Sequence, residues 1–139
     1  MKVLFVCIGN TCRSPMAEAL FNYESSNRKN NDEARSAGTS PYTHIIKETV
    51  EVMDEMGLDV GDHTPKLLSN ELIRWADKIV LLDESIINRL FNIPVDKKED
   101  IIVWDTEDPY KMSKKYFRRV RNLLHRKICD FIESKEKSA

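Results

Sequence analysis

Short apolar runs alternate along the chain with longer segments whose apolar residues recur at helical spacing. The runs have the length of β-strands and are mostly rich in Val, Ile and Leu: Lys2–Cys7, Glu33–Gly38, Lys78–Asp83 and Asp100–Trp104. Alternation of strands and helices is typical of proteins built around a parallel sheet. The pattern therefore predicts an α/β fold.

The segments between the runs predict the helices. The first helix follows the first strand directly, with Ser14 as its N-cap and Pro15 at its first helical position, where the missing N–H costs nothing. The second begins at about Thr43 and stops at Gly57, a residue suited to a helix C-terminus. Further helices are predicted around Ser69–Trp75, around Glu84–Phe91 and, as a long final helix, at about Lys114–Ser134.

The stretch that joins the first strand to the first helix reads CIGNTCRS, from Cys7 to Ser14. A loop that leaves a parallel strand and enters a helix binds anions, because backbone N–H groups and the helix dipole converge there. The same field stabilises a thiolate, so we expect Cys7 to be ionised and nucleophilic at neutral pH. Arg13 can return its guanidinium to the open side of the loop and bind two oxygens of a tetrahedral oxyanion.

Other residues of this loop also suit a phosphate cradle. Gly9 lets the backbone approach the anion and adopt a positive φ, while Asn10 tolerates a left-handed conformation and holds the loop through its amide. Ser14 can donate a hydrogen bond to the Cys7 sulfur and ease its departure late in a reaction. A buried cysteine that packs as a small hydrophobe is the alternative. The complete string in its strand-to-helix context favours the functional interpretation.

Neither a metal site nor a nucleotide site is predicted. Cys7 and Cys12 lack the C-x-x-C spacing of zinc ligands, and the histidines are scattered along the chain at His44, His63 and His125. The loop also lacks the G-K-[ST] ending of a nucleotide P-loop.

A phosphate that leaves an alcohol or phenol needs a proton on the departing oxygen, so a carboxylic acid is expected near Cys7. The candidates lie in WDTEDPY, Trp104 to Tyr110, just after the last strand and at the same edge of the sheet. We favour Asp108, because Pro109 biases it to an extended conformation. The alternative is that these acids cap the long final helix.

Composition narrows the class of protein further. The chain has 139 residues, a net charge of −1, 41% hydrophobic and 32% charged residues, which fits one soluble globular domain over residues 1–139. No apolar run approaches a bilayer span and no signal peptide is visible, so we expect a cytoplasmic protein without a membrane partner. Its three cysteines are expected to be reduced. The basic run Lys111–Lys127 is interpreted as a solvated helix face rather than a nucleic-acid site.

With these pieces in place, the sequence resembles the low-molecular-weight protein tyrosine phosphatase family. VCIGNTCRSPMAEALF is similar to its N-terminal signature, and SAGT (Ser36–Thr39), LLDES (Leu81–Ser85) and EDPY are similar to its second strand, third strand and acid loop. The resemblance implies a three-layer fold, in which a four-stranded parallel sheet in the order 2-1-3-4 has helices on both faces. It also implies action on phosphorylated proteins without metal or other cofactor. The oligomeric state is left open, with a monomer expected.

The same resemblance implies roles for single residues. Cys7 would be the nucleophile, Arg13 the transition-state clamp and Asp108 the general acid and then base. The phosphate-binding loop would comprise Ile8, Gly9, Asn10, Thr11, Cys12 and Ser14. Cys12 would be the redox partner that forms a reversible disulfide with Cys7 and protects it from irreversible oxidation; a structural loop thiol is the alternative.

The residues leave two substrate classes open, phosphotyrosine and phosphoarginine. Tyr42 and Tyr110 match positions at the rim of the family's slot for an aromatic substrate, which favours phosphotyrosine, although either could be an ordinary surface aromatic. Thr11 instead resembles the protein-arginine phosphatases of this fold. Arsenate reductase shares the cradle but needs further thiols after the third strand, and Asp83–Asn92 has none. A phosphoprotein-binding module without turnover is the non-catalytic alternative.

Overall fold

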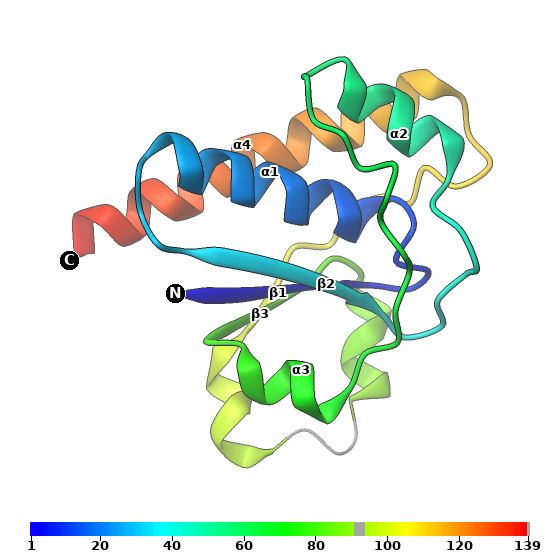
Figure 1. Ribbon diagram of the computed structural model, residues 1–139. Helices are drawn as coiled ribbons and strands as arrows, with labels where there is room; N and C mark the ends of the chain where they lie inside the picture. Colours follow the sequence, from blue (N-terminus) through cyan, green and yellow to red (C-terminus); the bar gives the residue numbers. More distant parts are fainter. Residues whose placement is uncertain (91–93, 139) are drawn as a thin grey trace.

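The computed structural model describes residues 1–90 and 94–138 and contains one parallel sheet (Figure 1). Its strands run in the spatial order β2-β1-β3-β4, and every neighbouring pair is parallel. Fold class and strand order are confirmed. The strands are β1 (Lys2–Cys7), β2 (Glu33–Gly38), β3 (Lys78–Leu81) and β4 (Ile101–Val103).

Helices cover both faces of the sheet, as predicted (Figure 1). One face carries α1 (Arg13–Asn27), α2 (Lys47–Asp54) and α4 (Lys114–Ser138). The other carries α3 (Asn70–Trp75) and the 3₁₀ helices η1 (Glu84–Arg89) and η2 (Val95–Asp100). No helix in the described part of the chain is both long and apolar enough to cross a membrane.

Strand β1 lies between two hydrophobic cores, which explains its unbroken apolar sequence. Val3 and Phe5 face α1 and α4, where Phe5 packs edge to face with Phe21 at a ring-centroid distance of 6.0 Å. Leu4 and Val6 face the opposite core with α3 and η1. Because β1 is buried on both faces, the loop that follows Cys7 starts from the most firmly held strand of the sheet.

Two helix starts differ from the prediction, and both lie beside that loop. Helix α1 begins at Arg13, so Ser14 lies inside its first turn and is not the N-cap. The Ser14 hydroxyl contacts the Cys7 sulfur instead. Helix α2 begins at Lys47 rather than Thr43, because Ile46 is extended and donates its N–H to the Thr11 carbonyl.

Other boundaries differ by small amounts. The end of the second helix is confirmed: Gly57 has φ 75° and Leu58 N–H closes the turn onto the Met53 carbonyl. Strands β3 and β4 are shorter than predicted, since the residues beyond them form the loops around Arg13. Helix α4 continues to Ser138. Helix η1 is 3₁₀ and ends at Arg89, and the predicted Phe91 lies outside the described residues.

Candidate active site

The loop from Cys7 to Ser14 is buried along almost its entire length and wraps around the Cys7 sulfur. The Ser14 Oγ lies 2.8 Å from Cys7 Sγ, and the backbone N–H of Asn10 donates to the same sulfur at 3.3 Å. The first turn of α1 also directs its unpaired N–H groups toward this loop. Cys7 therefore lies where hydrogen-bond donors converge, as the sequence predicted.

The Asn10 side chain is fully buried and holds the loop from within. Its Nδ2 donates to Ser14 Oγ at 2.8 Å and to Ser36 Oγ at 3.0 Å. Its Oδ1 accepts the Lys66 backbone N–H at 3.0 Å. Because the amide donates to Ser14 Oγ, the hydroxyl hydrogen of Ser14 is available for the Cys7 sulfur. The predicted left-handed conformation of Asn10 is confirmed, with φ 54°.

Gly9 and Gly38 are needed because neighbouring atoms lie too close for a Cβ, and not because of a positive φ. Among the described glycines only Gly57 has a positive φ, so the positive φ predicted for Gly9 is wrong. A Cβ at Gly9 would instead lie 3.0 Å from the Tyr42 ring. A Cβ at Gly38 would lie 2.5 Å from the Ile8 carbonyl oxygen. Gly38 was missed by the sequence reasoning; its position at the end of the second strand was the available signal.

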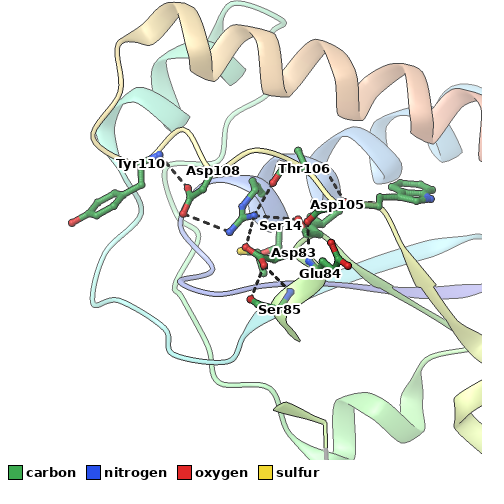
Figure 2. A network of polar contacts seen from close by, with 12 residues as sticks. Ser14, Asp83, Glu84, Ser85, Asp105, Thr106, Asp108 and Tyr110 are labelled. Atoms are coloured by element: carbon green, nitrogen blue, oxygen red, sulfur yellow. Dashed lines mark hydrogen bonds and ion pairs between the residues drawn. The ribbon is translucent and has the colours of Figure 1, made fainter. Parts of the chain in front are cut away.

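Arg13 is buried, and one arm of its guanidinium is anchored behind the loop. Nη1 donates to the carbonyls of Leu82 at 3.1 Å and Thr106 at 2.9 Å, and to Asp83 Oδ2 at 3.0 Å. Its Nη2 lies 3.5 Å from Asp108 Oδ2 (Figure 2). The guanidinium is thus held in place by the loops after β3 and β4.

Asp83 contacts both the Arg13 guanidinium and the start of η1. Oδ2 accepts from Arg13, while Oδ1 accepts the backbone N–H of Ser85 at the start of η1 (Figure 2). Burial would raise the pKa of this carboxyl, but the hydrogen bonds from Ser85 and Arg13 lower it overall. Asp83 is therefore a fixed negative charge that orients the guanidinium.

The three acids after β4 have different partners. Asp105 accepts the backbone N–H of Glu84 at 2.8 Å, and Glu107 pairs with Arg119 on α4 at 3.3 Å. Asp108 alone among the three lines the same cavity as Cys7. Its Oδ1 accepts the Tyr110 N–H at 3.1 Å (Figure 2). Of the three candidates, the structure thus brings only Asp108 to the cavity, and its role as the general acid stays a prediction.

A small open cavity lies above the loop. Tyr42 and Tyr110 form its outer wall, with ring centroids 5.3 Å apart and both rings partly exposed. The two predicted rim residues are therefore in contact with each other at the mouth. The full lining consists of Cys7, Gly9, Thr11, Cys12, Arg13, Tyr42, Asp108 and Tyr110.

Thr11 and Cys12 occupy the side of the loop that faces α2. Thr49 of α2 donates its hydroxyl to the Thr11 carbonyl at 2.8 Å, a support that the sequence reasoning missed. The Thr11 Oγ1 lies 3.8 Å from Cys12 Sγ. Burial raises the pKa of the Cys12 thiol to about 12. Cys12 is therefore protonated at neutral pH, although it lines the same cavity as Cys7.

His63 packs behind the loop. Its Nε2 lies 3.0 Å from the Asn10 carbonyl oxygen, and burial lowers the pKa of the imidazole. His63 thus supports the Asn10 backbone from outside the cavity. In the basic run, Arg118 and Arg121 pair with Glu55, and Lys114 pairs with Glu51. Part of the positive charge of this run is thus neutralised by Glu51 of α2 and by Glu55 directly after it.

A cysteine at the end of β1, an arginine six residues later and this sheet order are together typical of cysteine-based phosphatases. A family model described as low molecular weight phosphotyrosine protein phosphatase matches residues 2–139. The chain belongs to that family.

Its relatives differ in the activity that their names state. A low-molecular-weight protein tyrosine phosphatase from T. tengcongensis superposes with a TM-score of 0.89 and 35% identity, covering 96% of this chain and 99% of that one. The YwlE arginine phosphatase from Geobacillus stearothermophilus superposes with a TM-score of 0.83 and 26% identity, covering 99% and 94%. Arsenate reductase 2 of Staphylococcus saprophyticus is 32% identical over 133 residues, covering 95% and 96%.

Proposed function

We propose that this protein is a phosphatase of phosphorylated proteins, with phosphotyrosine as its preferred substrate and residues 1–139 acting as one catalytic domain. The observation that carries the proposal is the convergence of Cys7, Arg13 and Asp108 on one cavity. These residues supply a nucleophile, a charge clamp and a proton donor, which together complete a phosphoryl-transfer catalyst.

In the first step the Cys7 sulfur attacks phosphorus in line, forming the S–P bond while the bond to the leaving oxygen breaks. Asp108 gives its proton to that oxygen. Arg13 and the N–H groups of the loop stabilise the charge on the phosphoryl oxygens, which is the dominant contribution in phosphoryl transfer. The loop is already formed around the sulfur, so little reorganisation is needed as the charge develops.

In the second step water attacks phosphorus and the S–P bond breaks. Asp108, now ionised, takes the proton from water, and Cys7 leaves as a thiolate. The Ser14 hydroxyl, at 2.8 Å, can donate to that sulfur and make it a better leaving group. Phosphate departs and the enzyme returns to its initial state.

The aromatic wall supports phosphotyrosine. Tyr42 and Tyr110 offer flat, partly exposed rings beside the cavity, and an aromatic substrate ring can pack against such faces. Phosphoarginine is the second candidate, supported by Thr11, whose side chain lines the cavity, and by relatives named arginine phosphatases. The Thr11 hydroxyl could contact a guanidinium N–H or orient water.

Arsenate reduction is less well supported for this chain. Reduction of arsenate takes two electrons, which a thiol enzyme supplies by converting two thiols to a disulfide. Asp83–Asn92 contains no cysteine, and Cys129 lies on α4 beside Glu24 of α1. Cys12 is the remaining thiol near Cys7, and burial keeps it protonated.

We propose that Cys12 is the redox partner of Cys7. If Cys7 is oxidised to a sulfenic acid, attack by the Cys12 sulfur forms the disulfide and releases water. The high pKa of Cys12 makes this attack slow at neutral pH. The competing role, a purely structural loop thiol, predicts that no such disulfide appears after treatment with peroxide.

The decisive experiment compares phosphate release from p-nitrophenyl phosphate, phosphotyrosine peptides and phosphoarginine peptides. Cys7→Ser is expected to lose roughly 10⁴-fold or more in kcat on all of them. Wild type is expected to have the highest kcat/KM on phosphotyrosine, and Thr11→Val is expected to lower any phosphoarginine activity more than phosphotyrosine activity. Full turnover by Cys7→Ser would refute the mechanism, whereas faster release from phosphoarginine would reverse only the substrate ranking.

A further inference from the structure

A second cluster of reactive side chains lies at the seam between α1 and α4. It consists of Glu24 from α1 and of His125 and Cys129 from α4. Their carboxylate oxygen, ring nitrogen and sulfur all lie within 4.8 Å of one another. Glu24 is eleven residues beyond Arg13 on α1, about 16 Å along the helix axis, so the cluster is separate from the catalytic cavity.

The three ligand types match the requirements of zinc. Zn²⁺ binds Cys sulfur, His nitrogen and carboxylate oxygen at about 2.0–2.3 Å, and three protein ligands with a water make a common tetrahedral site. His125 and Cys129 are four residues apart, so they project from the same face of α4. Glu24 reaches them from the neighbouring helix, and its Oε1 already lies 2.8 Å from His125 Nε2.

The charge around the cluster favours a cation. Arg28 lies beside Glu24, but this one guanidinium faces three carboxylates, those of Glu24, Glu133 and Glu136, at 3.5–3.6 Å. Its Nε is buried and makes no hydrogen bond within the described residues. Arg28 therefore leaves Glu24 Oε1 to His125. The guanidinium also lies beside Cys129, but the three carboxylates around it outnumber its single positive charge.

The partial burial of the ligand side chains is also suitable for a bound ion. The side chains of His125 and Glu24 are 32% and 14% exposed, so an ion can enter from solvent and still lose part of its hydration.

We propose that Glu24, His125 and Cys129 form a zinc-binding site that joins α1 to α4. On binding, the Cys129 thiol gives its proton to solvent as the Zn–S bond forms, while His125 binds as the neutral imidazole. The ion joins the two helices whose packed faces complete the larger core. The site is independent of the proposed phosphatase activity.

The test uses Cys7→Ser/Cys12→Ser, a protein in which Cys129 is the one remaining thiol of three. Titration with Zn²⁺ is expected to give one bound ion, and Tm is expected to rise by roughly 5–10 °C at a hundredfold excess over Kd. Co²⁺ is the spectroscopic probe. It is expected to give a thiolate-to-cobalt charge-transfer band together with the visible absorption of a tetrahedral ion.

Variants of the cluster locate the ion. Adding Cys129→Ser should abolish the charge-transfer band, and His125→Gln or Glu24→Gln should each weaken binding at least about tenfold. His44→Gln, at an exposed histidine elsewhere, is the matched control and should bind as the parent does. Far-UV circular dichroism checks that each variant is folded. Unchanged Zn²⁺ affinity in folded Cys129→Ser, or no binding by the parent at about 100 µM Zn²⁺, would overturn the proposal.

Discussion

The phosphate-binding loop and the acid loop face the same cavity but are built in different ways. The phosphate-binding loop, residues 7–14, is buried, and the side chain of Arg13 at its end is only 2% exposed. The acid loop, residues 105–110, runs over the surface, and the side chain of Asp108 is 45% exposed. The groups proposed to stabilise charge are thus part of the core, while the proposed proton donor remains accessible to solvent.

This difference follows from what each group must do. Donors that stabilise a developing charge act best when they are fixed in advance, away from water, with all their other partners satisfied. Asn10 and Arg13 meet that condition through hydrogen bonds to Ser14, Ser36, Leu82 and Thr106. A general acid must instead exchange its proton with solvent and receive a water molecule. Asp108 accordingly has few partners.

After Cys7→Ser, the largest effect is expected from Arg13→Lys, which removes the planar clamp but keeps the charge. A lysine cannot bind the carbonyls behind the loop and two phosphoryl oxygens at once. We expect kcat to fall by roughly 10²–10³-fold on p-nitrophenyl phosphate. Arg126→Lys, at an exposed position on α4, is the matched control and should leave kcat unchanged. A loss of less than threefold in folded Arg13→Lys would mean that charge alone is sufficient.

Asp108→Asn tests the contribution of the acid loop apart from that of the phosphate-binding loop. An amide cannot protonate the departing oxygen, so hydrolysis of an alkyl phosphate or phosphotyrosine should fall by roughly 10²-fold or more. p-Nitrophenyl phosphate, whose leaving group needs little protonation, should lose much less. Asp105→Asn and Glu107→Gln are the controls within the same loop. An equal loss on every substrate would assign the proton to another acid.

Asn10→Ala tests whether the buried loop is also a stability element. It leaves the Lys66 N–H without its acceptor and puts alanine at φ 54°. Together these costs are expected to lower the free energy of unfolding by about 2–4 kcal/mol. Tyr110→Ala, in the exposed acid loop, should lower it by less than about 1 kcal/mol. Chemical denaturation measures both, and similar values would remove the distinction between the loops.

The strand order and the rim residues Tyr42 and Tyr110 were expected from the family resemblance, whereas the parallel sheet, the loop CIGNTCRS and Asp108 were predicted from the residues themselves. Short apolar runs specify strands buried on both faces, and the glycine and asparagine of CIGNTCRS are needed for local conformations and contacts that few other residues allow. Asp108 could be selected because Pro109 follows it. These predictions depend on short-range chemistry, which can be read along the chain.

Features that depend on contacts between distant segments could not be predicted. Ser14 fits an N-cap by local preference, but its hydroxyl contacts Cys7 Sγ, and only the folded loop decides between the two partners. The anchoring of Arg13 needs backbone carbonyls, which carry no residue-specific signal. The spacing of His125 and Cys129 on one helix face was visible, but nothing local connects them with Glu24.

The smallest effect is expected from Glu55→Gln, which tests whether helix α2, behind the loop, needs its anchor to α4. Hydrogen bonds from Arg118 and Arg121 lower the pKa of Glu55 from 4.5 to about 2. Because this pKa is lowered by folding, the pair stabilises the protein above about pH 5, and the contribution is lost as the pH falls toward 2. The Tm difference between wild type and Glu55→Gln should therefore be small at neutral pH and shrink to zero near pH 2.

Asp54→Asn, at an exposed acid next to Glu55, is the control and should show no such pH dependence. The kcat of Glu55→Gln should equal that of wild type, since Thr49 still binds the Thr11 carbonyl from the same helix. A Tm difference that persists at low pH would mean that the glutamate acts through packing rather than charge. A lower kcat would show that the phosphate-binding loop depends on α2 being anchored, and the loop would then be rigid through the helix layer rather than through its own hydrogen bonds.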